Sequence, residues 1–151
     1  MSELATSIGT LLGKKSGSGQ VWSASPNASV YHAIEIMADK KVGALPVMQD
    51  GALLGVISER DYARKVILQG RSSKDTRVVE IMTSPVIFIS PKHTVGECMR
   101  IMSKNRIRHL PVLDDGKVVG IITIGDLVNW VITEQEKTIL HLESYISGTP
   151  A

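Results

Sequence analysis

The sequence predicts an α/β (α+β) fold in which two β-α-β-β-α units pack about a pseudo-two-fold axis, with a short helix at each end. Three observations predict it. The segment 21–67 aligns with 86–132 at a constant offset of 65 residues without a gap, and 16 of the 47 aligned positions are identical. In each copy, apolar residues recur at spacings typical of strands and of helices. Each copy also carries an Asp-Gly pair between two apolar runs, which is typical of a β-hairpin.

The second copy shows the order of elements most clearly. The apolar run 86–89 predicts a buried strand, and Thr94 is a candidate N-cap for the amphipathic helix that follows. The segments 109–113 and 118–123 predict the two strands of the hairpin. A second helix is expected to begin near Gly125.

The first copy repeats this order. Its helical stripe begins at Val30, its hairpin strands are expected over 44–48 and 53–58, and its last helix is expected to begin near Tyr62. Each unit would expose an apolar sheet face that it cannot cover alone. We therefore expect the two units to pack face to face as one globule.

The chain is expected to divide into five segments. These are an N-terminal helix and flexible lead-in (1–19), the first repeat (20–68), a connector (69–85), the second repeat (86–132) and a C-terminal helix with a tail (133–151).

The C-terminal segment carries an apolar stripe at Ile132, Ile139, Leu142 and Ile146. One interpretation is that this helix covers the protein's own core. The other is that it pairs with a second copy across a dimer interface. The sequence leaves both open.

Composition excludes several classes of protein. The 151 residues have a formal net charge of +2 with scattered Lys and Arg, so a nucleic-acid partner is not expected. One cysteine, Cys98, excludes an intramolecular disulfide and a cysteine-based zinc site. No apolar stretch is long enough for a membrane span, and we expect a soluble, cytoplasmic protein. The histidines show no metal-ligand spacing, and dinucleotide and nucleophile-elbow motifs are absent, so we expect neither a metal nor an enzyme.

One local motif occurs in both copies. An apolar strand ends in a hydroxyl residue, and an aspartate follows three residues later at a helix start: Ser58 and Asp61, then Thr123 and Asp126. A carboxylate can accept hydrogen bonds from ribose hydroxyls, and the hydroxyl with the helix N-terminus suits a phosphate. The same pattern also fits a capping pair that only satisfies the helix end. Duplication does not decide between them.

A basic cluster lies before the hairpin of the second copy. Arg106, Arg108 and His109 stand where the first copy has Lys41, Gly43 and Ala44. Such a cluster suits a phosphate, although a solvated basic turn is the commoner role. Because one copy supplies basic side chains and the other small ones, we expect two non-equivalent pockets.

Together, the paired units, the Leu-Pro-Val strand, the Asp-Gly hairpin and the repeated hydroxyl–aspartate motif resemble a tandem pair of cystathionine-β-synthase (CBS) domains, a Bateman module. The resemblance covers residues 20–132. It implies a stand-alone bacterial-type signal-transduction protein that binds AMP, ATP or NAD in clefts between the repeats. It also implies a flat homodimer, no catalysis, and a separate effector protein. The alternative is a structural dimerisation or partner-docking module without a physiological ligand.

The resemblance further implies ligand-binding roles for thirteen residues: Trp22, Gly43, Ala44, Ser58, Arg60, Asp61, Thr83, Val86, Arg108, His109, Pro111, Thr123 and Asp126. An exposed helix face is the alternative role for Arg60 and for its neighbours Arg64 and Lys65, which add positive charge near the first motif. Which adenosine ligand is physiological, whether both clefts fill, and how a dimer is arranged stay open at this point.

Overall fold

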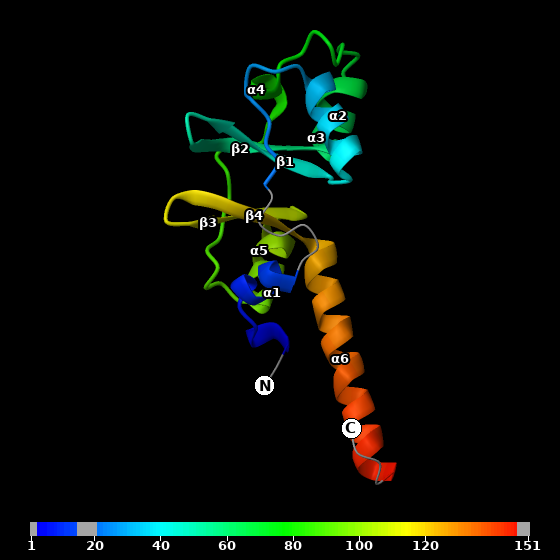
Figure 1. Ribbon diagram of the computed structural model, residues 1–151. Coiled ribbons are helices and arrows are strands. Elements are labelled where there is room, and N and C mark those ends of the chain that lie inside the picture. Colours follow the sequence, from blue (N-terminus) through cyan, green and yellow to red (C-terminus); the bar gives the residue numbers. More distant parts are fainter. Residues whose placement is uncertain (1–2, 15–20, 148–151) are drawn as a thin grey trace.

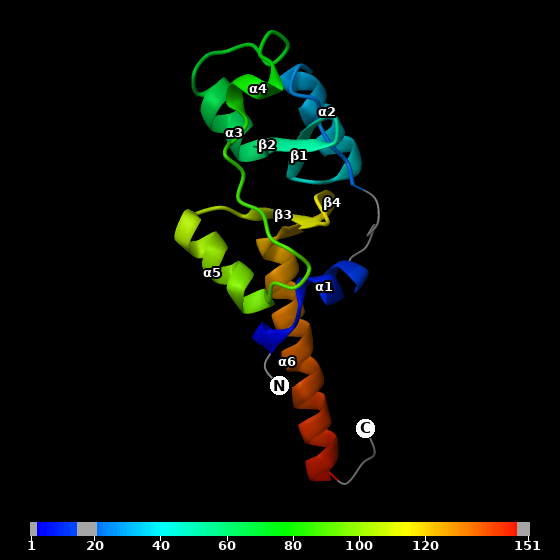
Figure 2. The same cartoon turned by 90° about the vertical axis from the view of Figure 1, so that its left-hand side faces the viewer.

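The computed structural model describes residues 3–14 and 21–147, and its elements stack in layers (Figure 1). Helices of the first repeat lie on one side, the helices of the second repeat lie on the other, and two β-hairpins lie between them (Figure 2). The first repeat contains α2 (Val30–Lys40), β1 (Ala44–Gln49), β2 (Ala52–Ser58), α3 (Glu59–Tyr62) and the π-helical turn η2 (Ala63–Ile67). The second contains α5 (Val95–Asn105), β3 (His109–Asp114), β4 (Lys117–Thr123) and α6 (Ile124–Ser147). The predicted α+β pair of units is confirmed.

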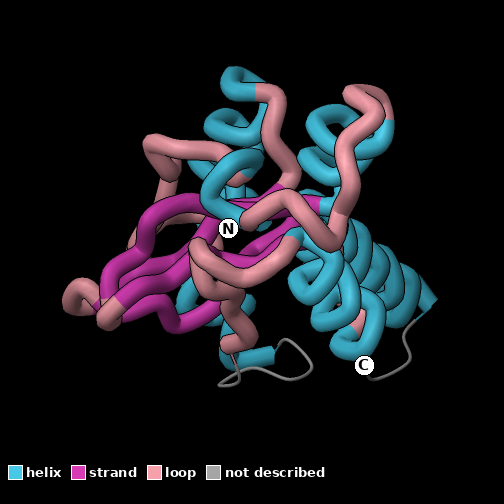
Figure 3. Tube along the Cα trace, turned by 90° about the horizontal axis from the view of Figure 1, so that it is seen from above, coloured by secondary structure: helices cyan, strands magenta, loops and turns pink. Residues whose placement is uncertain are grey.

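The two hairpins have the same geometry. In each, a two-residue Asp-Gly loop joins the strands, and both loop residues have positive φ: 52° and 80° at Asp50 and Gly51, 52° and 75° at Asp115 and Gly116. Positive φ at both positions is the type I′ turn that matches strand twist. Seen from above, the hairpin turns gather at one side of the molecule (Figure 3). The predicted hairpins are confirmed.

Each repeat closes a core of its own. Fully buried apolar side chains of the first repeat, such as Leu45 and Ile57, form one cluster, and those of the second, such as Leu110 and Ile122, form another. One face of each hairpin therefore packs on its own helices. The Arg60 guanidinium donates a hydrogen bond of 3.1 Å across the repeats to the carbonyl oxygen of Arg106.

The N-terminal helices pack on the second repeat, not the first. Ile8 of α1 (Ile8–Lys14) is fully buried in the second core, as Val78 of α4 (Val78–Ile81) is in the first. The Val95 amide donates to the Thr6 carbonyl at 2.9 Å, and the Val30 amide donates to the Thr76 carbonyl at 2.8 Å. Segments 3–14 and 73–84 are therefore structurally equivalent, at an offset of 70 residues. A short 3-10 helix, η1 (Glu3–Ala5), precedes α1.

The predicted buried strand over 86–89 was wrong. Ile89 makes only an isolated parallel bridge to Val112, while Ile87 and Phe88 are 38% and 54% exposed. The reason is a crossing of the chain: Thr83 still pairs with Val56 of the first hairpin. Between Thr83 and Ile89 the backbone passes from one hairpin to the other, so it cannot run along either.

The two helices expected after β4 are one continuous helix, α6. No Gly or Pro stands between Gly125 and Gly148 to end it. Its apolar stripe does not cover the core, because Ile139 is 54% and Leu142 is 53% exposed. The interpretation as a core-covering helix was therefore wrong. The expected flexible lead-in lies, after Lys14, outside the described residues. Among the described helices, none has the length and apolar character to cross a membrane.

Candidate functional site

The larger of two clefts between the repeats, the first cleft, has a volume of about 660 Å³. This is within the size range of small-molecule sites. Its lining comprises Gly43, Val56, Ser58, Glu59, Arg60, Asp61, Arg64, Lys65, Thr83, Pro85, Val86, Ile87, Arg106, Ile107, Arg108 and His109. Side chains from both repeats and from the connector thus meet in one cavity.

Asp61 is the most constrained polar residue of this cleft and is only 8% exposed. Its Oδ2 accepts hydrogen bonds from the Ser58 amide at 2.9 Å and from the Ser58 hydroxyl at 3.0 Å, and the Asp61 amide donates to Ser58 Oγ at 3.1 Å. This is a capping box at the start of α3. The capping interpretation of the motif is therefore realised at this helix end.

The other oxygen of Asp61 has different partners. Oδ1 accepts a hydrogen bond from the Thr83 hydroxyl at 3.1 Å and pairs with Lys65 Nζ at 3.0 Å. Lys65 Nζ also donates to the Ile81 carbonyl at 2.9 Å. Oδ1 and its cation lie at the cleft wall, where a polar ligand would have to compete with Lys65 for the carboxylate.

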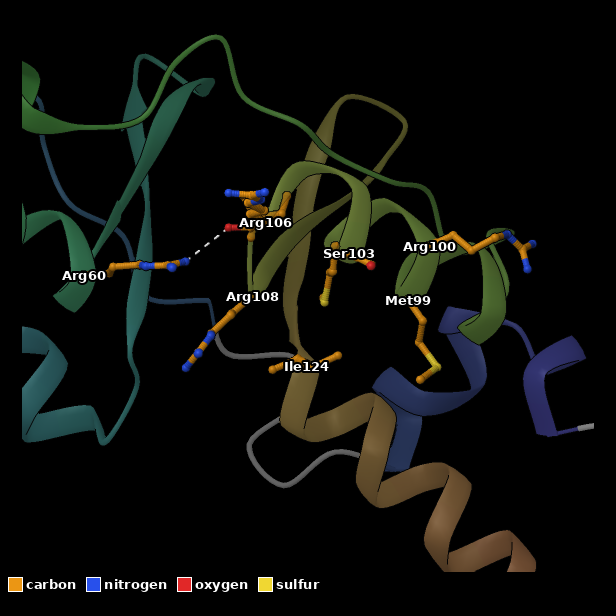
Figure 4. Close-up of a pocket in the computed structure, with 9 residues that line it drawn as sticks. Arg60, Met99, Arg100, Ser103, Arg106, Arg108 and Ile124 are labelled. Atoms are coloured by element: carbon orange, nitrogen blue, oxygen red, sulfur yellow. Dashed lines mark hydrogen bonds between the residues drawn. The ribbon is translucent and has the colours of Figure 1, made fainter.

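The second repeat supplies cations to the same cleft. Helix α5 is followed by Arg106 in the left-handed region (φ 54°), and β3 begins three residues later at His109. This tight helix-to-strand connection turns Arg106, Arg108 and His109 toward the first repeat. In Figure 4, Arg60 and Arg108 extend into the space between the repeats, whereas Arg100 points away from it. Guanidinium groups so placed suit a phosphate.

The second cleft has a volume of about 630 Å³. Its lining comprises Val21, Trp22, Asp39, Lys40, Lys41, Val42, Gly43, Ala44, Leu45, His109, Gly120, Ile121, Thr123 and Asp126. Asp126 accepts a hydrogen bond from the Thr123 amide at 2.8 Å and its own amide donates to Thr123 Oγ1 at 3.0 Å, which repeats the cap of Asp61. Lys40 Nζ lies 4.2 Å from the centre of the Trp22 ring, a cation–π contact at the wall of this cleft.

The two clefts share a wall. Gly43 and His109 line both of them. A third cavity of about 590 Å³, the outer pocket, opens beside the first cleft between α5 and the start of α6 (Figure 4). It is lined by Arg60, Met99, Arg100, Met102, Ser103, Arg106, Ile107, Arg108 and Ile124. Within residues 3–14 and 21–147, no group of three or more His, Cys, Asp or Glu side chains is placed to hold a metal ion.

Two separate segments of the chain, 18–67 and 78–133, match the family model for the CBS domain. The chain belongs to the CBS-domain family. CBS-domain pairs are generally regulatory, nucleotide-binding and non-catalytic.

This CBS-domain pair is similar to three proteins in particular. The mitochondrial CBS-domain protein CBSX3 of Arabidopsis thaliana is 42% identical over 141 residues, which are 90% of this chain and 68% of CBSX3. A solved structure of a protein with CBS domains from Burkholderia ambifaria is 48% identical, with a TM-score of 0.83 over 86% of this chain and 96% of that one. The hexameric CBS-CP12 protein from bloom-forming cyanobacteria is 27% identical, with a TM-score of 0.73 over 82% of this chain and 71% of that one.

The CBS repeats bring twelve of the thirteen predicted site residues to the clefts. Pro111 alone lies elsewhere: it is buried within β3, where its carbonyl accepts a hydrogen bond from the Ile89 amide. Ligand binding by these residues stays a prediction, and so does the cytoplasmic location. The sequence placed the charge of Lys65 near the first motif but did not predict its ion pair with Asp61, although the two residues are four apart, the spacing of neighbours on one helix face. The sequence also did not assign Glu59 and Ile87 to the cleft.

Proposed function

We propose that this CBS-domain pair is a regulatory module that senses an adenine nucleotide (AMP, ATP or NAD) bound in the clefts between its repeats. The observation that carries the proposal is the first cleft, where Asp61 of the first repeat lines the same cavity as Arg106 and Arg108 of the second. A carboxylate suits ribose hydroxyls and guanidinium groups suit phosphates. One nucleotide would therefore contact both repeats.

Charge separates the two clefts. The first contains five cationic side chains (Arg60, Arg64, Lys65, Arg106 and Arg108) and two carboxylates (Glu59 and Asp61). The second contains two lysines, Lys40 and Lys41, balanced by Asp39 and Asp126. We therefore expect a nucleotide with more than one phosphate to prefer the first cleft. The Trp22 ring offers the second cleft an aromatic surface for a base.

Sensing would follow from the position of the ligand. A nucleotide that contacts both repeats shifts the population toward the relative orientation of the repeats that it binds most tightly. The response is limited to the difference in nucleotide affinity between the two arrangements. In this proposal the module has no catalytic role, acts in the cytoplasm as a homodimer, and signals through a separate effector protein; the hexameric CBS-CP12 protein is a related assembly.

A second candidate function is a structural dimerisation or docking module without a physiological ligand. The capping boxes favour it, since Asp61 has a structural role at a helix start, and Asp126 repeats the pattern. Substitution of either aspartate would therefore weaken the helix as well as a ligand site. The test needs a residue that lines the cleft but holds no helix end.

The experiment is a thermal-shift series on the purified chain with AMP, ADP, ATP, NAD and GMP. A ligand that binds only the folded state at a hundredfold excess over Kd adds about 2.7 kcal/mol of stability. This should raise the melting temperature by several degrees. A rise with adenine nucleotides and none with GMP supports the proposal. No rise with any nucleotide, for protein free of bound nucleotide, leaves the docking module.

A pair of arginine variants locates the ligand. Arg108 is exposed and lines the first cleft, whereas Arg100 is exposed and points away from it. We expect Arg108→Ala to lower the affinity for ATP at least tenfold, which reduces the ATP-induced rise in melting temperature. Arg100→Ala removes the same charge and should leave that rise unchanged. Equal losses in both variants would indicate only a general effect of net charge. Fluorescence of Trp22 in a Trp130→Phe background reports separately on the second cleft, because these are the two tryptophans of the chain.

A further inference from the structure

The distal half of α6 projects away from the rest of the molecule (Figures 1 and 2). From Gln135 to Ile146 every residue is exposed except Ser144, which is half-buried. Several of these are large apolar residues, among them Leu142 at 53% and Ile146 at 83% exposure. Exposed apolar residues on a helix that extends beyond its own core indicate a surface that another molecule covers.

Five of the seven exposed large apolar residues of α6 follow a heptad pattern, and Leu140 and Tyr145 lie outside it. The seam positions succeed one another at alternating intervals of four and three residues: Val128, Ile132, Gln135, Ile139, Leu142 and Ile146. Ile132, Ile139 and Ile146 are the a positions, and Val128, Gln135 and Leu142 are the d positions. An average spacing of 3.5 residues is typical of a helix that supercoils with another helix, and it extends here over about three heptads.

The seam is separate from the face by which α6 packs on its own repeat. Leu127 is fully buried in the second core, and Trp130 and Val131 pack against that core. At about 100° per residue these three residues centre on a direction roughly 100° around the helix from the seam. A partner helix can therefore lie along the seam without displacing the second repeat.

The residues beside the seam favour one occupant and one orientation. The e positions are Asn129, Glu136 and Glu143, whereas the g positions are Val131, Thr138 and Tyr145. In a parallel pair of identical helices, e positions face g positions, and no like charges meet. In an antiparallel pair, e faces e, and Glu136 would lie near the partner's Glu143 with mutual repulsion. Isoleucine at every a position, with leucine at the d position Leu142, also favours two parallel strands.

We propose that α6 pairs with α6 of a second copy of this chain as a parallel, in-register, two-stranded coiled coil along the seam from Val128 to Ile146. In this arrangement the two Gln135 side chains meet in the core of the coiled coil, where their amide groups can donate to and accept from one another. A single polar core residue of this kind fixes register. The coiled coil does not depend on nucleotide binding, so it can fail or hold independently of the function proposed above.

The first test is the mass in solution, measured by light scattering on the full chain at tens of micromolar. We expect twice the 16.4 kDa of one chain. Ile139→Glu places a charge in the seam and should convert the protein to monomers. Leu140→Glu is the matched control, since Leu140 is as exposed, at 63%, but occupies a b position outside the seam. A monomeric parent protein, an unchanged mass for Ile139→Glu, or equal effects of both variants would overturn the proposal.

The second test determines orientation. Cys98 is fully buried, so an introduced cysteine is the accessible thiol of the folded protein. Gln135→Cys and Leu142→Cys, made separately, should both form interchain disulfides, because a parallel, in-register pair brings each position next to its own copy. An antiparallel pair can cross-link at one of the two positions at most. Cross-linking at only one position, or at neither, would overturn the parallel arrangement, with circular dichroism confirming that both variants are folded.

Discussion

Gly43 and His109 form the partition between the two clefts, and a Cβ on Gly43 would lie 3.3 Å from His109 Nε2 and 3.1 Å from Glu59 Oε1. These distances are shorter than ordinary van der Waals contacts, so a side chain at this position must push its neighbours into the clefts. A glycine here keeps the partition thin. A ligand bound in one cleft is therefore separated from the other cleft by little more than one side chain.

Gly43→Val should therefore impair both clefts at once. We expect at least a tenfold loss of nucleotide affinity in each, with a loss of about 1 kcal/mol in the free energy of unfolding from crowding. Thermal shift with ATP and Trp22 fluorescence measure the two clefts. Gly125→Ala is the control, because its Cβ would meet only Thr123 Oγ1 at an ordinary 3.5 Å. An effect confined to one cleft would show that the partition is not shared.

Lys65 holds the cleft-facing oxygen of Asp61, and its removal should affect stability and ligand binding in opposite directions. Lys65→Met keeps most of the side-chain stem but loses the ion pair to Asp61 and the hydrogen bond to the Ile81 carbonyl. We expect the free energy of unfolding to fall by about 1 kcal/mol, since the lysine is partly exposed. Adenosine, which has ribose hydroxyls but no phosphate, should bind more tightly because Asp61 Oδ1 loses its ion pair and keeps only the Thr83 hydroxyl.

Urea unfolding and calorimetric titration with adenosine measure these two effects. Lys104→Met, at an exposed position of α5, is the matched control and should change neither. Unchanged or weaker adenosine binding in Lys65→Met would show that the lysine does not compete for the carboxylate.

The N-terminal helix should contribute to the stability of the second repeat although it precedes the first in sequence. Ile8 is fully buried, with 0% of its surface exposed, and it lies in the core of the second repeat. Ile8→Ala should lower the free energy of unfolding by about 3 kcal/mol, through lost burial and a cavity. Leu4→Ala, at a residue that is 43% exposed, should cost about 1 kcal/mol or less. Urea unfolding compares them, and equal small losses would show that α1 is not part of that core.

Sequence reasoning predicted what local rules determine. The Asp-Gly loops require positive φ at two successive residues, and the predicted N-cap Thr94 accepts a hydrogen bond from a helix amide as expected. The constant offset of 65 residues predicted the paired units. The hydroxyl–aspartate motif also predicted which residues stand beside the clefts, because a strand end followed by a helix start points toward the opposing repeat.

Non-local effects explain the remaining differences. The run 86–89 is apolar enough for a strand, but the chain must cross there from one hairpin to the other. The equivalence of 3–14 with 73–84 lies at an offset of 70, not 65, and rests on few shared features, such as Thr6 with Thr76 and Ile8 with Val78. An alignment without gaps cannot reveal it. The contact of Lys65 with the Ile81 carbonyl joins segments 16 residues apart, which no local pattern predicts.

The buried thiol of Cys98 should make the free energy of unfolding depend on pH in the alkaline range. Burial raises the pKa of the Cys98 thiol to about 11, and the neighbouring Glu97 carboxylate adds to the increase. In the unfolded chain a cysteine titrates near pH 8.5. Between these values the unfolded state has lost the proton that the folded state retains, so the free energy of unfolding falls as pH rises through this window.

Cys98→Ala removes this contribution while leaving every other titrating group in place. We expect the difference in unfolding free energy between the parent protein and Cys98→Ala, measured in urea, to be constant below about pH 8 and to decrease steadily toward about pH 11. Iodoacetamide should modify native Cys98 at about pH 8 only as fast as the protein unfolds, because the thiolate is the reactive form. Modification at the rate of a free thiol under native conditions would show that Cys98 is accessible and would contradict its place in the core.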